Sequence, residues 1–167
     1  MKKLTCLLLV LFMLVSMSAC GAKQETKDNK DKNNNSTEDF KAPDMDAVFA
    51  SMKKKLPSDI TVFDNERAYD AYGIDPENCK QEIIVSVYDA AATYEIWLIE
   101  AQSEDALDDI KELATARLTS MREQFQSYDA NAFALAEKGK IITEGTCLVM
   151  IVAENAEELF DIYYDAF

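Results

Sequence analysis

The sequence contains no histidine, and only four glycines and three prolines occur in its 167 residues. Without an imidazole side chain, catalytic triads, His-ligated zinc sites and imidazole acid–base catalysis are excluded. Basic residues are also scarce: 17 Lys and Arg stand against 31 Asp and Glu, and the formal net charge is −14. Nucleic-acid binding needs clustered Lys and Arg to contact phosphates, so we expect no nucleic-acid partner.

The N-terminus has the pattern of a secretory signal. Two lysines precede an apolar run, residues 4–15, which is too short to span the about 30 Å of a bilayer's hydrocarbon core. The run leads through Ser18 and Ala19 to Cys20, as in a bacterial lipobox whose cysteine thiol accepts the lipid. We expect a lipoprotein signal peptide over 1–19 and acylation, including palmitate-type chains, at Cys20; the alternative is an ordinary cleaved signal followed by a chance cysteine.

A hydrophilic segment follows the cysteine. Residues 21–43 contain five Lys, five Asp or Glu and almost no apolar side chains, too few to offset the entropy cost of folding. We therefore expect the lipidated Cys20 and a disordered tether over 20–43, and one folded domain over 44–167. That domain holds 10 basic and 26 acidic side chains. Anionic headgroups would repel it, so we expect a domain held away from the bilayer rather than lying on it.

Hydrophobic periodicity predicts an α+β domain in the order α, α, β, β, α, β, β, α, with an antiparallel sheet of about four strands packed against helices. The last strand is apolar on both faces, which indicates cover on both sides. Asn155 and Glu158 have the spacing of a capping box. Helices are expected at 45–55, 65–72, 104–125 and after residue 155; strands at 81–88, 94–101, 140–143 and 146–153; connections at 89–93, 129–139 and the turn Glu144–Gly145.

Several features between residues 82 and 152 carry a family resemblance: Glu95-Ile96 in a strand, Arg117 in the long helix, Tyr128 after it, and Gly145 in the hairpin. In these features the chain resembles the domain of unknown function 4358 family, small lipoproteins of low-GC Gram-positive bacteria. Asp129 stands where the family usually has a proline. The resemblance implies a surface lipoprotein with a similar fold, and it implies no known activity.

Arg117 is the one residue whose position calls for a specific partner. It lies on the apolar stripe of the long helix, where a guanidinium must reach solvent or pair with a carboxylate. We expect an internal ion pair with a strand acid, Glu95. A ligand-anchoring role is the weaker interpretation.

Cys79 and Cys147 are the only thiols in the predicted domain. An extracytoplasmic location permits a disulfide between them, and buried free thiols are the alternative. A nucleophilic role would normally need a histidine, which is absent. The acidic residues of the 104–112 segment are interpreted as a solvated helix face, so we expect no metal site and no cofactor.

These observations lead to two hypotheses. The first is a non-enzymatic lipoprotein at the extracytoplasmic face of the cell membrane, anchored by Cys20, whose acidic domain interacts with an envelope protein or the cell wall. The second is a small-ligand or cation-binding surface protein, for example a transporter accessory, which would need a defined concave site.

Overall fold

The computed structural model describes residues 40–87 and 94–167. The expected signal peptide, Cys20, most of the expected tether and the 89–93 connection lie outside these residues. The described elements follow in chain order: α1 (Met45–Met52), η1 (Lys53–Lys55), β1 (Ile60–Val62), α2 (Asn65–Tyr72), η2 (Pro76–Asn78), β2 (Cys79–Val87), β3 (Glu95–Ala101), α3 (Glu104–Phe125), α4 (Ala130–Lys138), β4 (Lys140–Glu144), β5 (Cys147–Val152) and α5 (Ala156–Tyr164).

The strands form one antiparallel sheet in the order β1-β2-β3-β5-β4. The α+β class and the antiparallel sheet are confirmed, but the described sheet has five strands rather than four. The additional strand, β1, is only three residues long and pairs through Ile60–Val62 with the end of β2. β5 lies between β3 and β4, and all six of its residues are buried, as its apolar sequence predicted.

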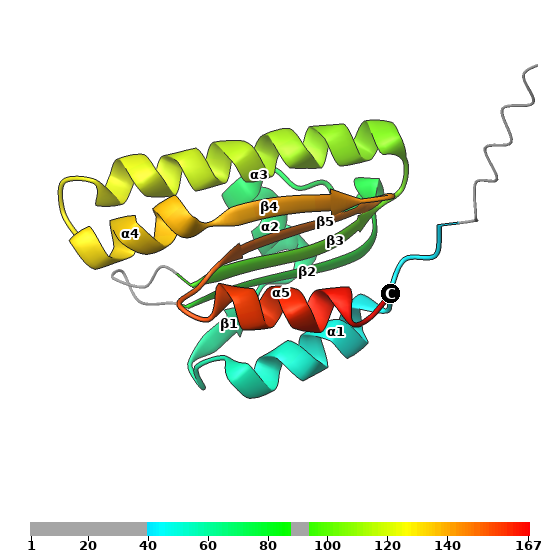
Figure 1. Cartoon of the computed structure of the whole chain (residues 1–167). Coiled ribbons are helices and arrows are strands. Elements are labelled where there is room, and N and C mark those ends of the chain that lie inside the picture. The colour runs from blue at the N-terminus through cyan, green and yellow to red at the C-terminus, as the bar shows by residue number, and fades with distance from the viewer. Residues whose placement is uncertain (1–39, 88–93) are drawn as a thin grey trace, which may run out of the picture. The chain divides into compact units, whose positions relative to one another are not determined.

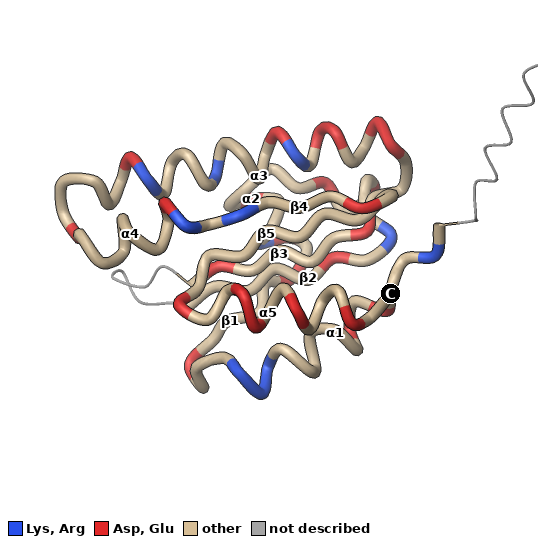
Figure 2. Tube along the Cα trace, viewed as in Figure 1, with Lys and Arg blue, Asp and Glu red and all other residues tan. Residues whose placement is uncertain are grey.

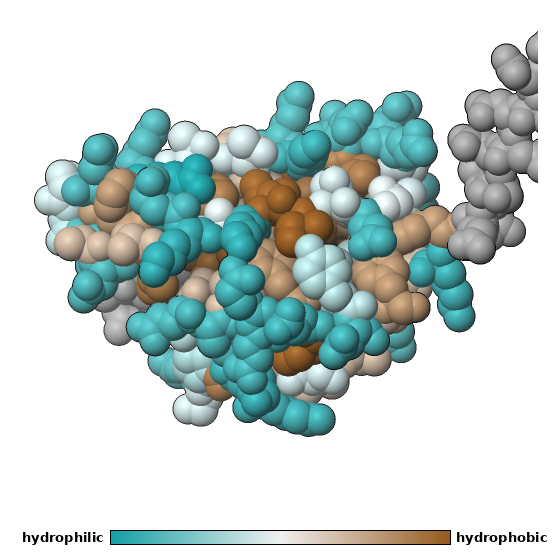
Figure 3. Space-filling model, in the orientation of Figure 1, coloured by the Kyte–Doolittle hydropathy of each residue, from teal (hydrophilic) through white to brown (hydrophobic). Residues whose placement is uncertain are grey.

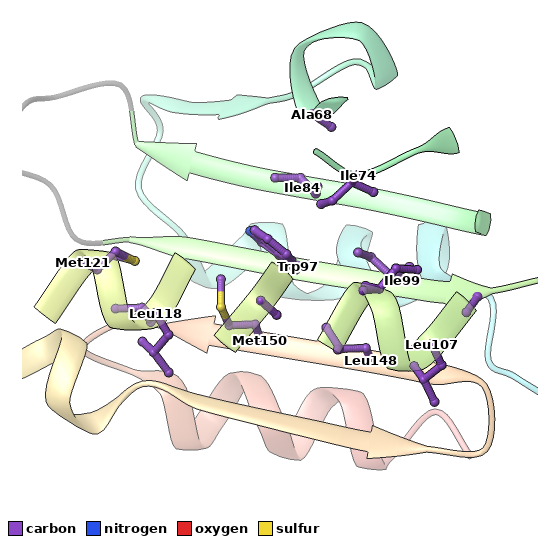
Figure 4. Close-up of a cluster of buried hydrophobic side chains, with 14 of the residues drawn as sticks. Ala68, Ile74, Ile84, Trp97, Ile99, Leu107, Leu118, Met121, Leu148 and Met150 are labelled. Carbon is purple, nitrogen blue, oxygen red and sulfur yellow. The ribbon is translucent and has the colours of Figure 1, made fainter. Parts of the chain in front are cut away.

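Helices cover both faces of the sheet (Figure 1). On one face, α2, α3 and α4 pack over Ile84, Trp97 and Met150 (Figure 4). On the other face, α1 and α5 lie side by side over Leu98 and Val149. Two cores therefore share one sheet, and alternate residues of β3 and β5 contribute to each. Complete burial of a side chain such as Leu98 or Val149 contributes about 1.5–3 kcal/mol to the stability of the fold.

Two sequence features determine the long helix α3: a capping residue at its start and a stripe of apolar side chains along its length. The Ser103 hydroxyl accepts a hydrogen bond from the Ala106 N–H at 3.1 Å, and Glu104 and Asp105 lie in the positive first turn. Its buried residues recur every three or four positions, which gives the helix one apolar face. They are Ala106, Leu107, Ile110, Ala114, Leu118, Met121 and Phe125.

The expected loop at 129–139 is wrong, because residues 130–138 form α4. The Asp129 carboxylate accepts hydrogen bonds from the Asn131 and Ala132 N–H groups at 2.9 and 3.0 Å and begins the helix. Gly139 then ends it in a crowded position: an added Cβ would lie 2.7 Å from the Leu118 side chain.

Two local details also differ from expectation. The hairpin turn is Gly145–Thr146 rather than Glu144–Gly145, and Gly145 has φ +53°, which suits a glycine at the first central position of a two-residue turn. Asn155 does not cap α5 through its side chain. Its amide instead donates to the Lys55 carbonyl at 3.2 Å, which ties the start of α5 to the end of η1.

Residues 40–43 pack on the domain, so the folded unit begins before residue 44. Gln81 of β2 holds this segment: its amide donates to the Pro43 carbonyl at 3.0 Å and to Glu100 at 2.7 Å, and its carbonyl oxygen accepts from the Met45 N–H at 2.9 Å. The Phe40 ring packs on Gly145 and lies 5.9 Å from the Phe167 ring. The described start of the chain therefore lies beside its C-terminus (Figure 1).

Candidate functional site

Glu95 is the only charged residue that is buried among residues 40–87 and 94–167, with 1% of its surface exposed. It opens β3 and shares a sheet face with Trp97, two residues along the strand. The Trp97 indole N–H donates to the Glu95 carboxylate at 3.0 Å. A carboxylate in such a position is strongly destabilising unless its oxygens are bonded and its charge is compensated.

Arg117 supplies the compensating charge from α3. Its Nε donates to both Glu95 oxygens at 2.9 and 3.0 Å, and its Nη2 donates to Oε2 at 2.6 Å. The structure thus brings together the two residues expected to pair. Burial alone would lower the pKa of Arg117, but the hydrogen bonds and charge of Glu95 raise it above its ordinary value.

Aromatic rings surround this ion pair, and the sequence did not indicate them as part of a site. The Tyr72 ring lies 5.0 Å from the Trp97 ring and stacks on Phe63 at 5.6 Å. The Arg117 guanidinium lies 5.2 Å from the centre of the Tyr72 ring. Burial and then the charge of Glu95 raise the pKa of the Tyr72 hydroxyl. The tyrosine hydroxyl is therefore neutral at physiological pH.

A second acidic group lies on the same sheet face and is less well bonded. Glu82 of β2 is half-buried, and its Oε2 has no hydrogen-bond partner among the described atoms. Burial raises its pKa, and the neighbouring Cys79 thiol partly offsets that effect. Burial and the Glu82 charge in turn raise the pKa of Cys79 to about 12, so this thiol is a poor nucleophile at neutral pH.

The disulfide considered between Cys79 and Cys147 is wrong, since both thiols are free. The two residues lie on the strands either side of β3 and therefore about 10 Å apart across the sheet, farther than the roughly 4.4–6.8 Å between Cα atoms that a disulfide needs. Their side chains also face opposite sides: Cys79 packs on the α3 core and Cys147 on the α5 core. Burial and the Glu100 charge raise the pKa of Cys147 to about 11.

The outer surface is strongly acidic. Acidic residues gather on the first half of α3 and along α5 (Figure 2). A surface hollow on the outer face of α3 is lined by Asp108, Lys111, Glu112, Thr115 and Ala116, and none of the Glu95 partners lines it. Within the described ranges, no group of three or more Cys, Asp or Glu residues could hold a metal ion. The same ranges contain no helix that is long and apolar enough to span a membrane.

A comparison with protein-family models matches the elements that form this cluster. A model described as Domain of unknown function (DUF4358) matches residues 52–153, more than half of the chain. The protein belongs to the DUF4358 family. The matched segment runs from the end of α1 through β5, and so contains the whole sheet and both residues of the Glu95–Arg117 pair. No curated protein and no solved structure matches the chain.

Within this DUF4358 domain, the Glu95 cluster is suited to a structural role. The carboxylate accepts from Arg117 and Trp97, and these bonds occupy both of its oxygens. A general base or nucleophile needs an oxygen that can reach a substrate. The cluster therefore joins β3, α2 and α3 at one point rather than presenting a reactive group.

Proposed function

We propose that this DUF4358 protein is a lipoprotein anchored in the cell membrane by acylated Cys20, and that its acidic domain is a non-enzymatic interaction module on the extracytoplasmic face. The observation that carries the proposal is the N-terminal pattern, in which two lysines and a short apolar run lead to Ser18, Ala19 and Cys20. Maturation would add more than one acyl chain, as stable anchoring requires.

The chemistry of the described domain supports a binding role over catalysis. The buried carboxylate of Glu95 is fully bonded, and both thiols have a raised pKa. The sequence has no histidine, and apart from the half-buried Glu82 of β2 the remaining carboxylates lie mostly on helix faces exposed to water.

The charge distribution supports a protein or cell-wall partner rather than the bilayer itself. Acidic side chains outnumber basic ones 26 to 10 over residues 44–167. Charge of one sign speeds association with a partner of opposite sign and opposes contact with anionic lipid. We propose an envelope protein with a basic surface as the partner.

Metabolic labelling of cells that express the full chain tests the anchor. With an alkyne-tagged palmitate analogue, we expect the native chain to be labelled and to sediment with membranes. Cys20→Ser should lose the label and leave the membrane fraction, whereas Cys6→Ser, the matched control within the expected signal peptide, should keep it. Label on the Cys20→Ser chain, or none on the native chain, would contradict the anchor.

Chemical crosslinking in intact cells followed by mass spectrometry tests the module. We expect one envelope protein to be captured by the native chain and lost with Cys20→Ala, which removes the anchor and leaves the domain unchanged. Titration calorimetry with Ca²⁺, Mg²⁺ and muropeptides provides the second arm. Saturable heat there, with no captured protein, would contradict partner binding and favour the ligand- or cation-binding alternative.

A further inference from the structure

β4 lies at the end of the sheet and has one edge without a strand. It pairs with β5 only, through five consecutive residues from Lys140 to Glu144. In the parts of the chain that the structure describes, no backbone hydrogen bond joins the other edge to a neighbouring segment. Such an edge presents a row of donors and acceptors that can pair with another strand.

The opposite edge of the sheet differs, because β1 has three residues and β4 has five. β4 also carries two adjacent isoleucines, Ile141 and Ile142, both only partly buried. Figure 3 shows apolar surface along β4, between α3 and α5. β4 is thus the longer of the two edge strands, and it offers more backbone donors and acceptors to a partner strand.

We propose that the β4 edge binds the β4 edge of a second copy of this chain, in antiparallel register about a two-fold axis at Ile142. The resulting dimer has one continuous sheet across both copies. This inference is independent of the anchor at Cys20, because it rests on β4 alone.

The sequence of β4 is complementary to itself in this register. Lys140 lies opposite Glu144 of the second copy, and the symmetry repeats that opposite-charge pair at the other end of the strand. Ile142 lies opposite its own symmetry mate, and Ile141 lies opposite Thr143. Opposite-charge and β-branched pairs are the cross-strand pairs that stabilise antiparallel sheets. Moving the axis by one residue brings Lys140 opposite an uncharged residue.

The backbone geometry permits the same register. In an antiparallel pair, alternate residues turn both backbone groups away from the partner strand. The two-residue turn makes Glu144–Cys147 the closing pair with β5, so Ile141 and Thr143 direct their N–H and C=O groups to the free edge. With the axis at Ile142, Ile141 of one copy meets Thr143 of the other, and both residues exchange hydrogen bonds.

Two charge variants and their mixture test the pairing. Lys140→Glu places two acids together at each end of the dimer strand pair, and Glu144→Lys places two lysines together. We expect each purified full-length variant to self-associate about tenfold more weakly than the native chain in sedimentation velocity. An equimolar mixture should regain the native affinity, because each copy then meets the opposite charge.

The control for Lys140 is Glu157→Gln. Lys140 Nζ also contacts Glu157 at 2.6 Å within one chain, and both side chains are exposed. Glu157→Gln removes that contact without changing the β4 edge, so it should leave the dimer affinity unchanged.

Thr143→Pro tests the backbone bonds. The proline removes an N–H on the free edge and leaves the ladder to β5 intact, a position where edge strands accept proline. We expect monomers by sedimentation with a native circular-dichroism spectrum, whereas Thr143→Val should remain dimeric. Monomeric native protein at all concentrations tested would overturn the proposal, as would charge variants whose mixture stays monomeric. A dimer that persists in Thr143→Pro would place the interface elsewhere and would overturn it equally.

Discussion

Arg117 on α3 and Glu95 on β3 form the one ion pair, among the described residues, in which a partner is completely buried. The closest approach of their atoms is 2.6 Å. Glu95 has 1% of its side-chain surface exposed and Arg117 has 27%, so the guanidinium lies at the rim and the carboxylate lies beneath it. The pair therefore links the centre of the sheet to the helix that covers it.

Arg117→Ala should destabilise the domain by about 3–5 kcal/mol, because it leaves the Glu95 charge buried without compensation. Chemical denaturation measures the change. Arg122→Ala is the matched control on the same helix: Arg122 donates to the Ala136 carbonyl at 3.0 Å and contacts the exposed Glu137 at 3.5 Å, but its removal leaves no buried charge, so we expect a smaller loss. The double variant Arg117→Leu/Glu95→Leu should recover part of the stability. An unchanged unfolding midpoint in Arg117→Ala would contradict the structural role of the pair.

Native Cys79 and Cys147 should react slowly with iodoacetamide at pH 8. Burial raises the pKa of Cys79 to about 12 and that of Cys147 to about 11, from an ordinary value of 9.0. The thiolate fraction at pH 8 is therefore lower by a factor of roughly one hundred or more. Peptide mass spectrometry should show both sites labelled rapidly only after denaturation. Rapid labelling of either cysteine in the native protein would show that its environment is more open than described.

Glu82→Gln should stabilise the domain near pH 7 and have little effect near pH 4. Burial raises the pKa of Glu82 in the fold, so the unfolded chain releases this proton first as pH rises. Stability is therefore fully present below the ordinary pKa of 4.5 and falls as pH rises through the higher folded value. Urea titrations at several pH values should show the difference between native and variant growing with pH. A constant difference would mean that Glu82 titrates normally.

Gly139→Ala should cost about 1–3 kcal/mol, the usual effect of overpacking a core. The backbone tolerates the change, since the φ of Gly139 is −56°, but the added methyl would lie 2.7 Å from Leu118 and 2.8 Å from Val152. A thermal melt of the variant checks this. If the midpoint is unchanged, the junction of α4 and β4 is looser than the contacts indicate.

Helices and strands with a clear hydrophobic periodicity or recognisable end signals were predictable from sequence. α3 was predicted with its correct ends, because Ser103 caps it and its apolar stripe runs without a break. β1 was missed, since three residues are too short to show alternation and the strand exists through pairing with β2. α4 was missed because Asp129 was interpreted as a departure from a family proline, although its carboxylate is a good helix cap.

The site, too, was predictable where a local sequence pattern determines a contact, and was not predictable where the contact depends on tertiary packing. The Arg117–Glu95 contact was expected because a guanidinium on an apolar stripe needs an acid opposite it. Tyr72 was not, since the contact depends on where α2 packs, which no local pattern encodes. The two cysteines were left open for a related reason. The face of Cys79 depends on an irregular register between Cys79 and Gln81, and such a bulge reverses the side of the sheet on which a residue lies.

The attachment of residues 40–43 has a mechanical consequence. A pull on the chain at Phe40 meets the Phe40 ring contacts first and then the hydrogen bonds of Gln81 to Pro43 and Met45. Gln81 lies in β2 and is paired there with Glu100 of β3. Tension from the N-terminal side would thus be passed to the β2–β3 pair before it could pull α1 away from the sheet. Residues 40–43 would therefore bear tension applied from the N-terminal side before the folded domain does.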